Sequence, residues 1–300
     1  MREYPLIIIN PKSTLANNVK QFFDVHKIKH IVNYKKENMG NIIKDNLKKG
    51  LDSFIICGGD GTVNHFINSY MVLPKKQRDS MKIGFIPCGK ANDLSRALNI
   101  SNDVKSAFNQ ILKRRIKSID LIRVNNSYFI TGGGLGLPTE IVEDVNRISS
   151  TKIGRQLNKR VKDAVYYISV IKKIILGYRG VGPIEIEDHY KGNKRLMLLS
   201  VQNQQFIGKR FKLAPDADNS DGLFEVCAIE KPGNIITNLL MIQNIIKGRH
   251  LRSANVFEMK GKSLLISTEK LEHFMGDGEL LCYANTFKID IVPHAIKVYY

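Results

Sequence analysis

The chain has 300 residues, of which 43% are hydrophobic and 25% charged, and its 46 Lys and Arg against 28 Asp and Glu give a formal net charge of +18. It shows no low-complexity tract and no repeat. No apolar stretch approaches the length of a membrane span, which is about 20 residues. The excess positive charge predicts an anionic partner, either nucleic acid, nucleotide phosphate or an acidic membrane surface, unless it serves solubility alone.

The first ten residues hold only a four-residue aliphatic run, which is too short for a signal-peptide core and predicts a buried strand instead. We therefore expect a cytosolic protein. The cysteines have neither the spacing of a zinc site nor that of a disulfide framework, so we expect them to be reduced. They are Cys57, Cys88, Cys227 and Cys282.

The first third of the chain alternates between strand-like and helix-like segments. The patterns predict strands at 4–10, 28–34, 52–59 and 81–89 and helices at 41–50 and 62–71. Such alternation favours an α/β domain with a mostly parallel sheet covered by helices. Ligands of these sheets bind beyond the carboxyl ends of the strands.

After about residue 120 the chain changes to many short strands broken by Gly, Asn and Asp, which predicts a β-rich antiparallel sandwich or barrel. Two longer helical patterns interrupt these strands, at 154–176 and 233–248. We expect a nucleotide-binding domain over 1–121 and a β-rich domain over 122–300. The last strand can return to the first domain.

Three glycines surround one carboxylate in Gly58-Gly59-Asp60-Gly61-Thr62, between an expected strand and an expected helix. N–H groups at a helix start favour phosphate, and glycine lets the backbone approach it. Asp60 would repel phosphate unless a cation lies between them, so its presence indicates Mg²⁺ or catalysis. The alternative is a structural turn in which Thr62 caps the helix.

A second turn of this kind follows the next expected strand, in FIPCGKANDLSRAL at 85–98. Turns at the ends of neighbouring strands can hold a polyphosphate from both sides. The alternative is loop punctuation, with the aspartate as an ordinary helix-start charge. The candidate nucleotide-binding residues of this turn are Gly89, Lys90, Asn92 and Asp93.

These motifs resemble those of the diacylglycerol kinase catalytic-domain family of soluble bacterial lipid kinases, which are related to sphingosine kinases. The resemblance covers nearly the whole chain, through GGDGTVNHFIN at 58–68, PCGKANDLSRAL at 87–98, IDLIRVNNSYFITGGGLG at 119–136 and DGELL at 277–281. It implies an ATP site in the cleft between the two domains. It also implies six residues that hold the ATP phosphates: Asn10, Ser13, Gly59, Asp60, Gly61 and Thr62.

The resemblance implies that Glu279 is the general base. A carboxylate within reach of a lipid hydroxyl can accept its proton while Mg²⁺ offsets charge on the γ-phosphoryl group. Without the resemblance, Asp277-Gly278 would be read as a hairpin turn, since Asp-Gly is a common turn pair.

A cluster of aspartates in APDADNSDGLFEV at 214–226 suits Mg²⁺ or Ca²⁺, unless it is a solvated acidic loop. The resemblance implies a structural Mg²⁺ here, held by Asp221, by the carbonyl group of Leu223 and by Asp218. It also implies that Asp120 reaches this metal through water and ties the two domains together.

Three residues depart from the family pattern: His65 replaces its usual Glu, Lys90 its usual Thr or Ser, and Thr14 its usual Gly. The first two changes make a non-catalytic lipid or nucleotide sensor the rival of an active kinase. Because Asp60, Asp93 and Glu279 are all kept, we favour an active enzyme.

The segment 154–180 places Leu157, Val161, Ala164, Ile168, Ile171 and Ile175 on one helical face, with lysines and arginines on the others. Such a stripe most often packs on a sheet. A basic amphipathic helix can also lie on an anionic membrane.

The resemblance as a whole implies a cytoplasmic, ATP- and Mg²⁺-dependent lipid kinase that docks peripherally on anionic membrane and phosphorylates a diacylglycerol-like lipid. A sphingoid base, phosphatidylglycerol or a soluble alcohol is the alternative acceptor. Nucleic acid is disfavoured because no known reader motif is present. The oligomeric state stays open, a homodimer included.

Overall fold

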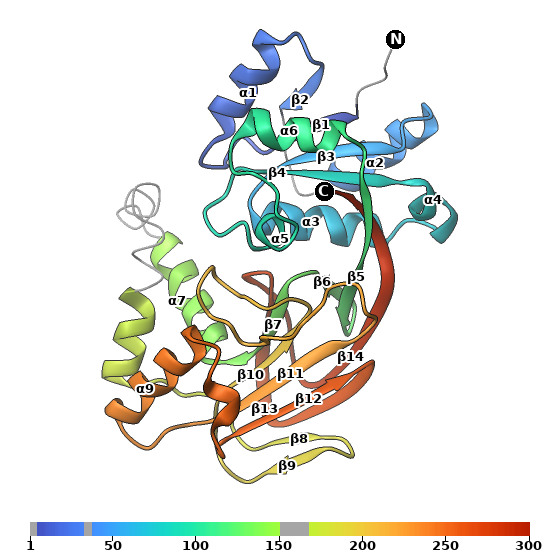
Figure 1. Ribbon diagram of the computed structural model, residues 1–300. Coiled ribbons are helices and arrows are strands. Elements are labelled where there is room, and N and C mark those ends of the chain that lie inside the picture. Colours follow the sequence, from blue (N-terminus) through green and yellow to red (C-terminus); the bar gives the residue numbers. More distant parts are fainter. Residues whose placement is uncertain (1–4, 33–37, 151–167) are drawn as a thin grey trace.

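The computed structural model describes residues 5–32, 38–150 and 168–300, which form two lobes joined by long strands (Figure 1). Strand β14 (Glu279–Tyr299) runs from one lobe into the other, and β5 (Ile116–Val124) pairs with it antiparallel. These two strands place both lobes on one continuous sheet.

The N-terminal lobe is built on parallel strands, as the alternating pattern predicts. Their order across the sheet is β2 (His30–Val32), β1 (Leu6–Ile9), β3 (Ser53–Gly58) and β4 (Lys82–Pro87), and the end of β14 joins them beside β4. Every residue of β1 is buried, because helices cover both faces of this sheet.

The described residues of this lobe form the helices α1 (Ala16–Val25), α2 (Met39–Lys48), α3 (Asp60–Met71), α4 (Lys75–Ser80), α5 (Asp93–Ala97) and α6 (Val104–Leu112). Helices α1 and α6 contact each other over β1 and β4, while α2 contacts α3, which packs on β3. Gly50 follows α2 with a φ of 81°, the left-handed conformation expected after a helix end.

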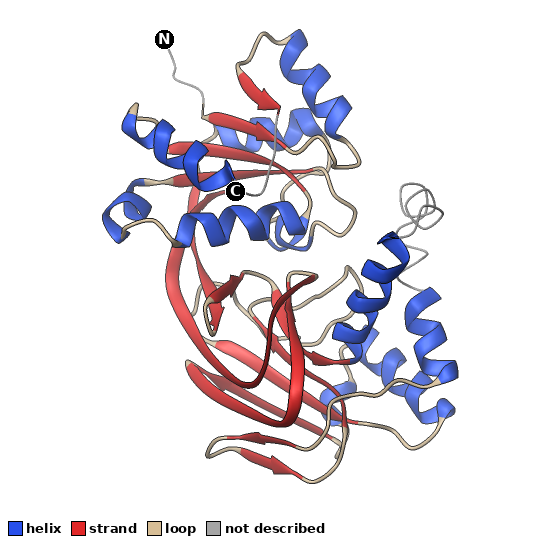
Figure 2. Cartoon of the chain, turned by 180° about the vertical axis from the view of Figure 1, so that it is seen from behind, coloured by secondary structure: helices blue, strands red, loops and turns tan. Residues whose placement is uncertain are grey.

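The C-terminal lobe is an antiparallel sheet that curls around its own core, seen from behind in Figure 2. Its strand order is β12 (Val256–Gly261), β11 (Phe224–Glu230), β10 (Leu196–Gln202), β7 (Gly132–Gly136), β13 (Ser263–Gly276) and β14. Three short strands extend it: β6 (Ser127–Phe129), β8 (Ile184–Ile186) and β9 (Tyr190–Gly192).

Helices gather on one side of the C-terminal lobe (Figure 1). They are α7 (Leu137–Ser150), helical residues 168–176, α9 (Ile235–Ile246) and the short 3₁₀ helix η2 (His250–Arg252). Helix α9 begins with a capping box, in which the Asn234 side chain accepts the Thr237 N–H and the Thr237 hydroxyl oxygen accepts the Asn234 N–H.

One expectation about the strands was wrong. The patterns at 280–292 and 296–300 predict two strands, but the structure has the single strand β14, in which the register with β5 shifts between Val292 and Ile296. Pro293 lies in this irregular stretch, where a strand tolerates a residue that cannot donate a hydrogen bond.

The expected packing of the apolar stripe was also wrong for the residues that the structure describes. Ile168, Ile171 and Ile175 are 54–61% exposed, while Val170 and Ile174 face the core. Leu157, Val161 and Ala164 lie outside the described residues.

The hydrophobic core of the N-terminal lobe includes Leu121 and Ile130, and also Val298 from the last strand. The core of the C-terminal lobe contains Ile122 and Val124. The division of the chain at residue 121 stays a prediction. Cys57 and Cys88 are buried at the ends of β3 and β4, and all four cysteines are free thiols. Among the described residues, no helix combines the length and apolar character that spanning a bilayer requires.

We expect Phe287→Ala to lower the free energy of unfolding by about 3–5 kcal/mol, because this fully buried ring packs on Phe274 in the C-terminal core. Tyr283→Ala, on the same strand but 58% exposed, should cost well under half as much. Urea unfolding of both variants measures the difference. Equal losses of unfolding free energy in the two variants would show that burial of Phe287 in this core contributes no more to stability than an exposed ring does.

Candidate active site

The two glycine turns lie against each other because β3 and β4 are neighbouring parallel strands. Gly58 pairs with Pro87 at the strand ends, and the Cys88 N–H donates to the Gly58 carbonyl oxygen at 2.9 Å. A Cβ atom on Gly59 would lie 2.9 Å from the Gly89 Cα, which is closer than real side chains approach. Only glycine at these positions lets the turns meet.

The carboxylate of Asp60 joins the first turn to the second. Its oxygens accept the backbone N–H groups of Asn92 at 2.9 Å and Asp93 at 2.8 Å. Burial raises the pKa of Asp60, while these two N–H donors and the Lys209 ammonium favour the charged form. Asp60 therefore fixes the second turn, a role that its position among glycines does not predict.

Asn92 shapes the second turn from within. Its backbone is left-handed, with φ 52° and ψ 45°, and its side chain both accepts the Gly89 N–H and donates to the Gly89 carbonyl oxygen. Asparagine suits such a position because its short amide can hydrogen-bond the adjacent backbone.

Asp93 connects the lobes. Its carboxylate accepts the N–H groups of Gly208 at 2.6 Å and Lys209 at 3.0 Å, both in the C-terminal lobe. Burial and the nearby Asp60 carboxylate raise its pKa to about 6. Arg96, one turn later, donates to the Lys209 carbonyl oxygen at 2.7 Å. The aspartate is thus more than an ordinary helix-start charge.

A third loop, after β1, lies beside the glycine turns. The Asn10 side-chain amide donates to the Thr62 hydroxyl oxygen at 2.7 Å, and the Ser13 N–H donates to the Asn10 carbonyl oxygen. Thr62 does not cap α3, because the N-cap position belongs to Gly59 and no side chain caps this helix. The structure brings Asn10 and Ser13 to the same end of the sheet as both turns.

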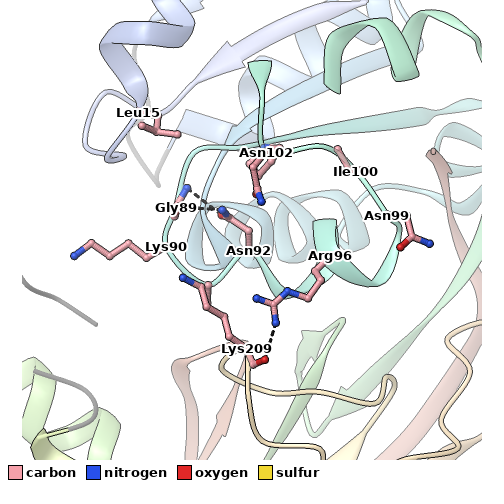
Figure 3. Close-up of a pocket in the computed structure, with 11 residues that line it drawn as sticks. Leu15, Gly89, Lys90, Asn92, Arg96, Asn99, Ile100, Asn102 and Lys209 are labelled. Carbon is pink, nitrogen blue, oxygen red and sulfur yellow. Dashed lines mark hydrogen bonds between the residues drawn. The ribbon is translucent and has the colours of Figure 1, made fainter. Parts of the chain in front are cut away.

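A cavity of about 550 Å³ opens beside these loops (Figure 3). This is within the usual size range of small-molecule sites. Its lining includes three cationic residues and no carboxylate. The lining residues are Leu15, Pro87, Gly89, Lys90, Ala91, Asn92, Arg96, Asn99, Ile100, Asn102 and Lys209.

Glu279 reaches the first turn from the other lobe. It is the first residue of β14, and its Oε1 atom lies 2.5 Å from where a Cβ atom on Gly61 would be. A side chain at position 61 would displace this carboxylate from the turn. The structure therefore brings Glu279 to the start of α3, 218 positions along the chain from Gly61 (279 − 61).

Asp277 is a site residue that sequence reasoning missed. Its carboxylate is buried and accepts hydrogen bonds from the Asn64 side chain at 2.8 Å, the Ile130 N–H at 3.0 Å and both the N–H and hydroxyl groups of Thr131. Burial raises its pKa, and these donors oppose that effect. Asp277 also forms the expected turn, with a φ of 52°. Asp277 is part of the DGE block that carries the family resemblance, but the pattern of an Asp-Gly turn does not show which groups its carboxylate contacts.

The expected metal ligands are only partly brought together. Asp120 is fully buried beside the loop, where it accepts the Gly222 N–H at 2.7 Å and the His294 N–H at 2.6 Å. Asp221 turns back to accept the Leu223 N–H at 3.0 Å.

The remaining expected ligand, Asp218, faces Ser220 and the Lys117 ammonium group. Lys117 Nζ lies 3.7 Å from Asp218 Oδ1 and donates to Asn219 at 2.8 Å. Among the described residues, no three carboxylate, histidine or cysteine side chains form a metal cluster. A lysine already supplies positive charge here, so these residues do not fit a structural Mg²⁺ as they stand.

We expect the pH dependence of stability to report on Asp93. Its pKa is about 6 in the folded protein, whereas an unfolded aspartate has a pKa of about 3.9. Between these two pH values the folded protein therefore binds more protons than the unfolded chain. Its contribution to the free energy of unfolding is full below about pH 4 and falls as the pH rises to about 6.

The difference in unfolding free energy between the wild type and Asp93→Asn should therefore change by about 1–3 kcal/mol across this window. Urea unfolding between pH 4 and 7 measures it, with Asp45→Asn at an exposed position of α2 as the control. Parallel pH profiles for the wild type and Asp93→Asn would contradict the assignment.

Comparison with known proteins bears on both lobes. The model of the "Diacylglycerol kinase catalytic domain" matches residues 5–124, and that of the "YegS C-terminal NAD kinase beta sandwich-like domain" matches residues 149–300. The diacylglycerol kinase of Bacillus subtilis (strain 168) is 27% identical over 240 residues, covering 79% of this chain and 74% of that protein. A "Putative lipid kinase" of Staphylococcus aureus (strain Newman) is 26% identical over 277 residues, covering 90% and 86%.

A solved structure shares the fold over its full length. The "Crystal structure of a putative diacylglycerol kinase from Bacillus anthracis str. Sterne" matches with a TM-score of 0.75 and 23% identity, covering 99% of this chain and 97% of that one. Its likeness establishes the α/β lobe and the β-rich lobe as a shared architecture. With both family models matched in chain order, this chain belongs to the diacylglycerol kinase-like lipid kinase family, in which a diacylglycerol kinase catalytic domain is joined to a YegS-type β-sandwich-like domain.

Proposed function

We propose that this protein transfers the γ-phosphoryl group of ATP to a hydroxyl group of a diacylglycerol-like lipid at a membrane surface. The observation that carries this proposal is the position of Glu279, whose carboxylate comes from the C-terminal lobe and lies against Gly61 in the first turn of α3. A proton acceptor is thus held next to a backbone shaped for phosphate.

The nucleotide would bind as its magnesium complex, MgATP, with its phosphates along Gly59, Gly61 and Gly89. The adjacent cavity, with Lys90, Arg96 and Lys209 in its lining, is large enough for the nucleoside part. Positive charge without a lining carboxylate favours a polyanion. Magnesium bound to ATP offsets charge on the γ-phosphoryl group.

In the reaction, the lipid hydroxyl oxygen attacks the γ-phosphorus while the bond from that phosphorus to the bridging oxygen of ADP breaks. Glu279 accepts the hydroxyl proton. Asp60 would lie beside the phosphates, and its hydrogen bonds to the N–H groups of Asn92 and Asp93 would hold the second turn in position for them. No step depends on a metal at Asp218, Asp221, Leu223 and Asp120.

The lobes would divide this work. We assign nucleotide binding to residues 1–121 and lipid binding to residues 122–300, with the protein in the cytoplasm and docked peripherally on anionic membrane. A sphingoid base, phosphatidylglycerol or a soluble alcohol is the competing acceptor, and a non-catalytic sensor is the competing class. Oligomeric state does not enter the reaction, because Glu279 reaches Gly61 within one chain.

We expect Glu279→Gln to lower the rate of γ-phosphoryl transfer about 100-fold or more, because the amide cannot accept the hydroxyl proton. Labelled ATP with Mg²⁺ and mixed vesicles of candidate lipids measures transfer and names the acceptor. Glu269→Gln, at an exposed position of β13, is the matched control.

Absence of label in every lipid and soluble alcohol, despite ATP binding by the wild type, would rule out the kinase and leave the sensor. Unchanged transfer by Glu279→Gln would instead leave the kinase standing and exclude this residue as its base.

We expect Lys90→Ala to weaken ATP binding about tenfold, because the change removes one cation from the lining of the cavity. Lys113→Ala, an exposed lysine of the same lobe, should change the affinity little. Titration calorimetry with MgATP compares the two variants. Tighter binding by Lys90→Ala would show that this lysine crowds the nucleotide.

A further inference from the structure

Two neighbouring helices of the C-terminal lobe expose an unusual amount of apolar surface. We call this surface the apolar helix face. Its side chains are each 43–72% exposed, and surfaces of this kind commonly mark sites of protein or membrane contact. They are Ile168, Ile171, Ile175 and Leu176 of residues 168–176, and Ile235, Ile236, Leu239, Leu240 and Ile246 of α9.

The core does not need these side chains. The inner sides of the same helices already pack together, with Val170 and Ile174 in one core cluster with Met241 and Ile245. The Tyr178 hydroxyl donates to the buried Asn238 side chain at 2.6 Å and fixes the end of one helix to the other. Both helices therefore carry apolar side chains on an inner and on an outer side, which is typical of a helix covered on both sides.

Charge identifies what covers the outer side. Neither 168–176 nor 235–246 contains Asp or Glu, and exposed basic residues border the apolar helix face: Lys172, Arg179, Lys247 and Arg249. An apolar surface bordered by exposed cations fits an anionic lipid bilayer, into which aliphatic side chains insert while lysine and arginine contact headgroups. One of these cations, Arg179, also pairs with Glu272 at 2.6 Å. A second copy of this chain would bring like charges together.

We propose that the apolar helix face is the surface by which this protein docks on an anionic bilayer, with α9 inserting its aliphatic side chains. The proposal deepens the proposed function, since it rests on a lipid acceptor held in a membrane. It keeps Ile168, Ile171 and Ile175 of the predicted stripe of 154–180 and adds α9, a helix that shows no basic amphipathic pattern of its own.

The docking helix is also connected to the candidate active site. The Lys212 N–H donates to the Ile245 carbonyl oxygen near the end of α9, and the His250 ring lies 3.2 Å from the Leu213 carbonyl oxygen. The same loop carries Gly208 and Lys209, which Asp93 holds. Docking through α9 would therefore place the bilayer at a fixed position relative to the nucleotide cavity.

The test measures binding to vesicles without nucleotide, by sedimentation with phosphatidylglycerol–phosphatidylcholine vesicles and with phosphatidylcholine vesicles. The test variant is Ile236→Ser/Leu240→Ser, at side chains that are 67% and 53% exposed. The control is Val25→Ser/Val72→Ser, whose side chains are 70% and 77% exposed on the other lobe. Neither pair belongs to the cores, so both variants should fold.

We expect the test variant to bind phosphatidylglycerol vesicles about tenfold or more weakly than the wild type, and the control to bind them equally well. Wild-type binding should weaken with added salt and with removal of phosphatidylglycerol. Equal binding by the test variant, or no binding by the wild type, would overturn the proposal. A wild-type dimer that the test variant dissociates would overturn it too, because the face would then join two copies.

A separate assay keeps this test distinct from the proposed function. Transfer to a dispersed short-chain diacylglycerol requires no docking, so the test variant should retain wild-type activity there. Absence of transfer by the wild type would count against the kinase alone. The vesicle result would still decide the docking surface.

Discussion

The buried carboxylate of Asp277 accepts hydrogen bonds from Asn64 in the N-terminal lobe and from Ile130 and Thr131, which lie between β6 and β7. A buried carboxylate is stable only when several donors replace its water. Removing one of these donors would weaken the compensation of this buried group, so the contacts of Asp277 favour the observed relative position of Asn64 and the 130–131 segment. Glu279 lies two residues further along, and its place beside Gly61 follows from that position.

The same chemistry recurs around the glycine turns. Asp60 binds the start of α5, and Asp93 at that start binds Gly208 and Lys209 across the lobes. These carboxylates lie close enough that each disfavours the charge of the other, which is part of why the pKa of Asp93 is raised. The nearby cations Arg96 and Lys209 stabilise the charged forms of these two adjacent carboxylates.

Much of the fold was predictable because local signals agreed with it. The glycine turns, the parallel strands and the nearness of Gly59 to Gly89 follow from strand ends and glycine chemistry. The role of Asp277 does not, because an Asp-Gly hairpin turn has the same sequence whether or not its carboxylate receives four donors. Nor does the Lys117 contact, which joins a strand residue to a loop 101 positions away (218 − 117) and so depends on tertiary structure.

The prediction of which face of residues 168–176 is buried failed for the same reason, because it depends on tertiary structure. Spacing identified Ile168, Ile171 and Ile175 as one stripe, but Val170 and Ile174 form another, and periodicity cannot choose between two apolar faces of one helix. Only the neighbouring helix decides, since Met241 and Ile245 take the second stripe. A helix with two apolar faces packs one of them on the core and leaves the other exposed. In a chain of net charge +18, whose family acts on lipids, the spare face and its cationic border meet the physical requirements of a surface that contacts anionic lipid.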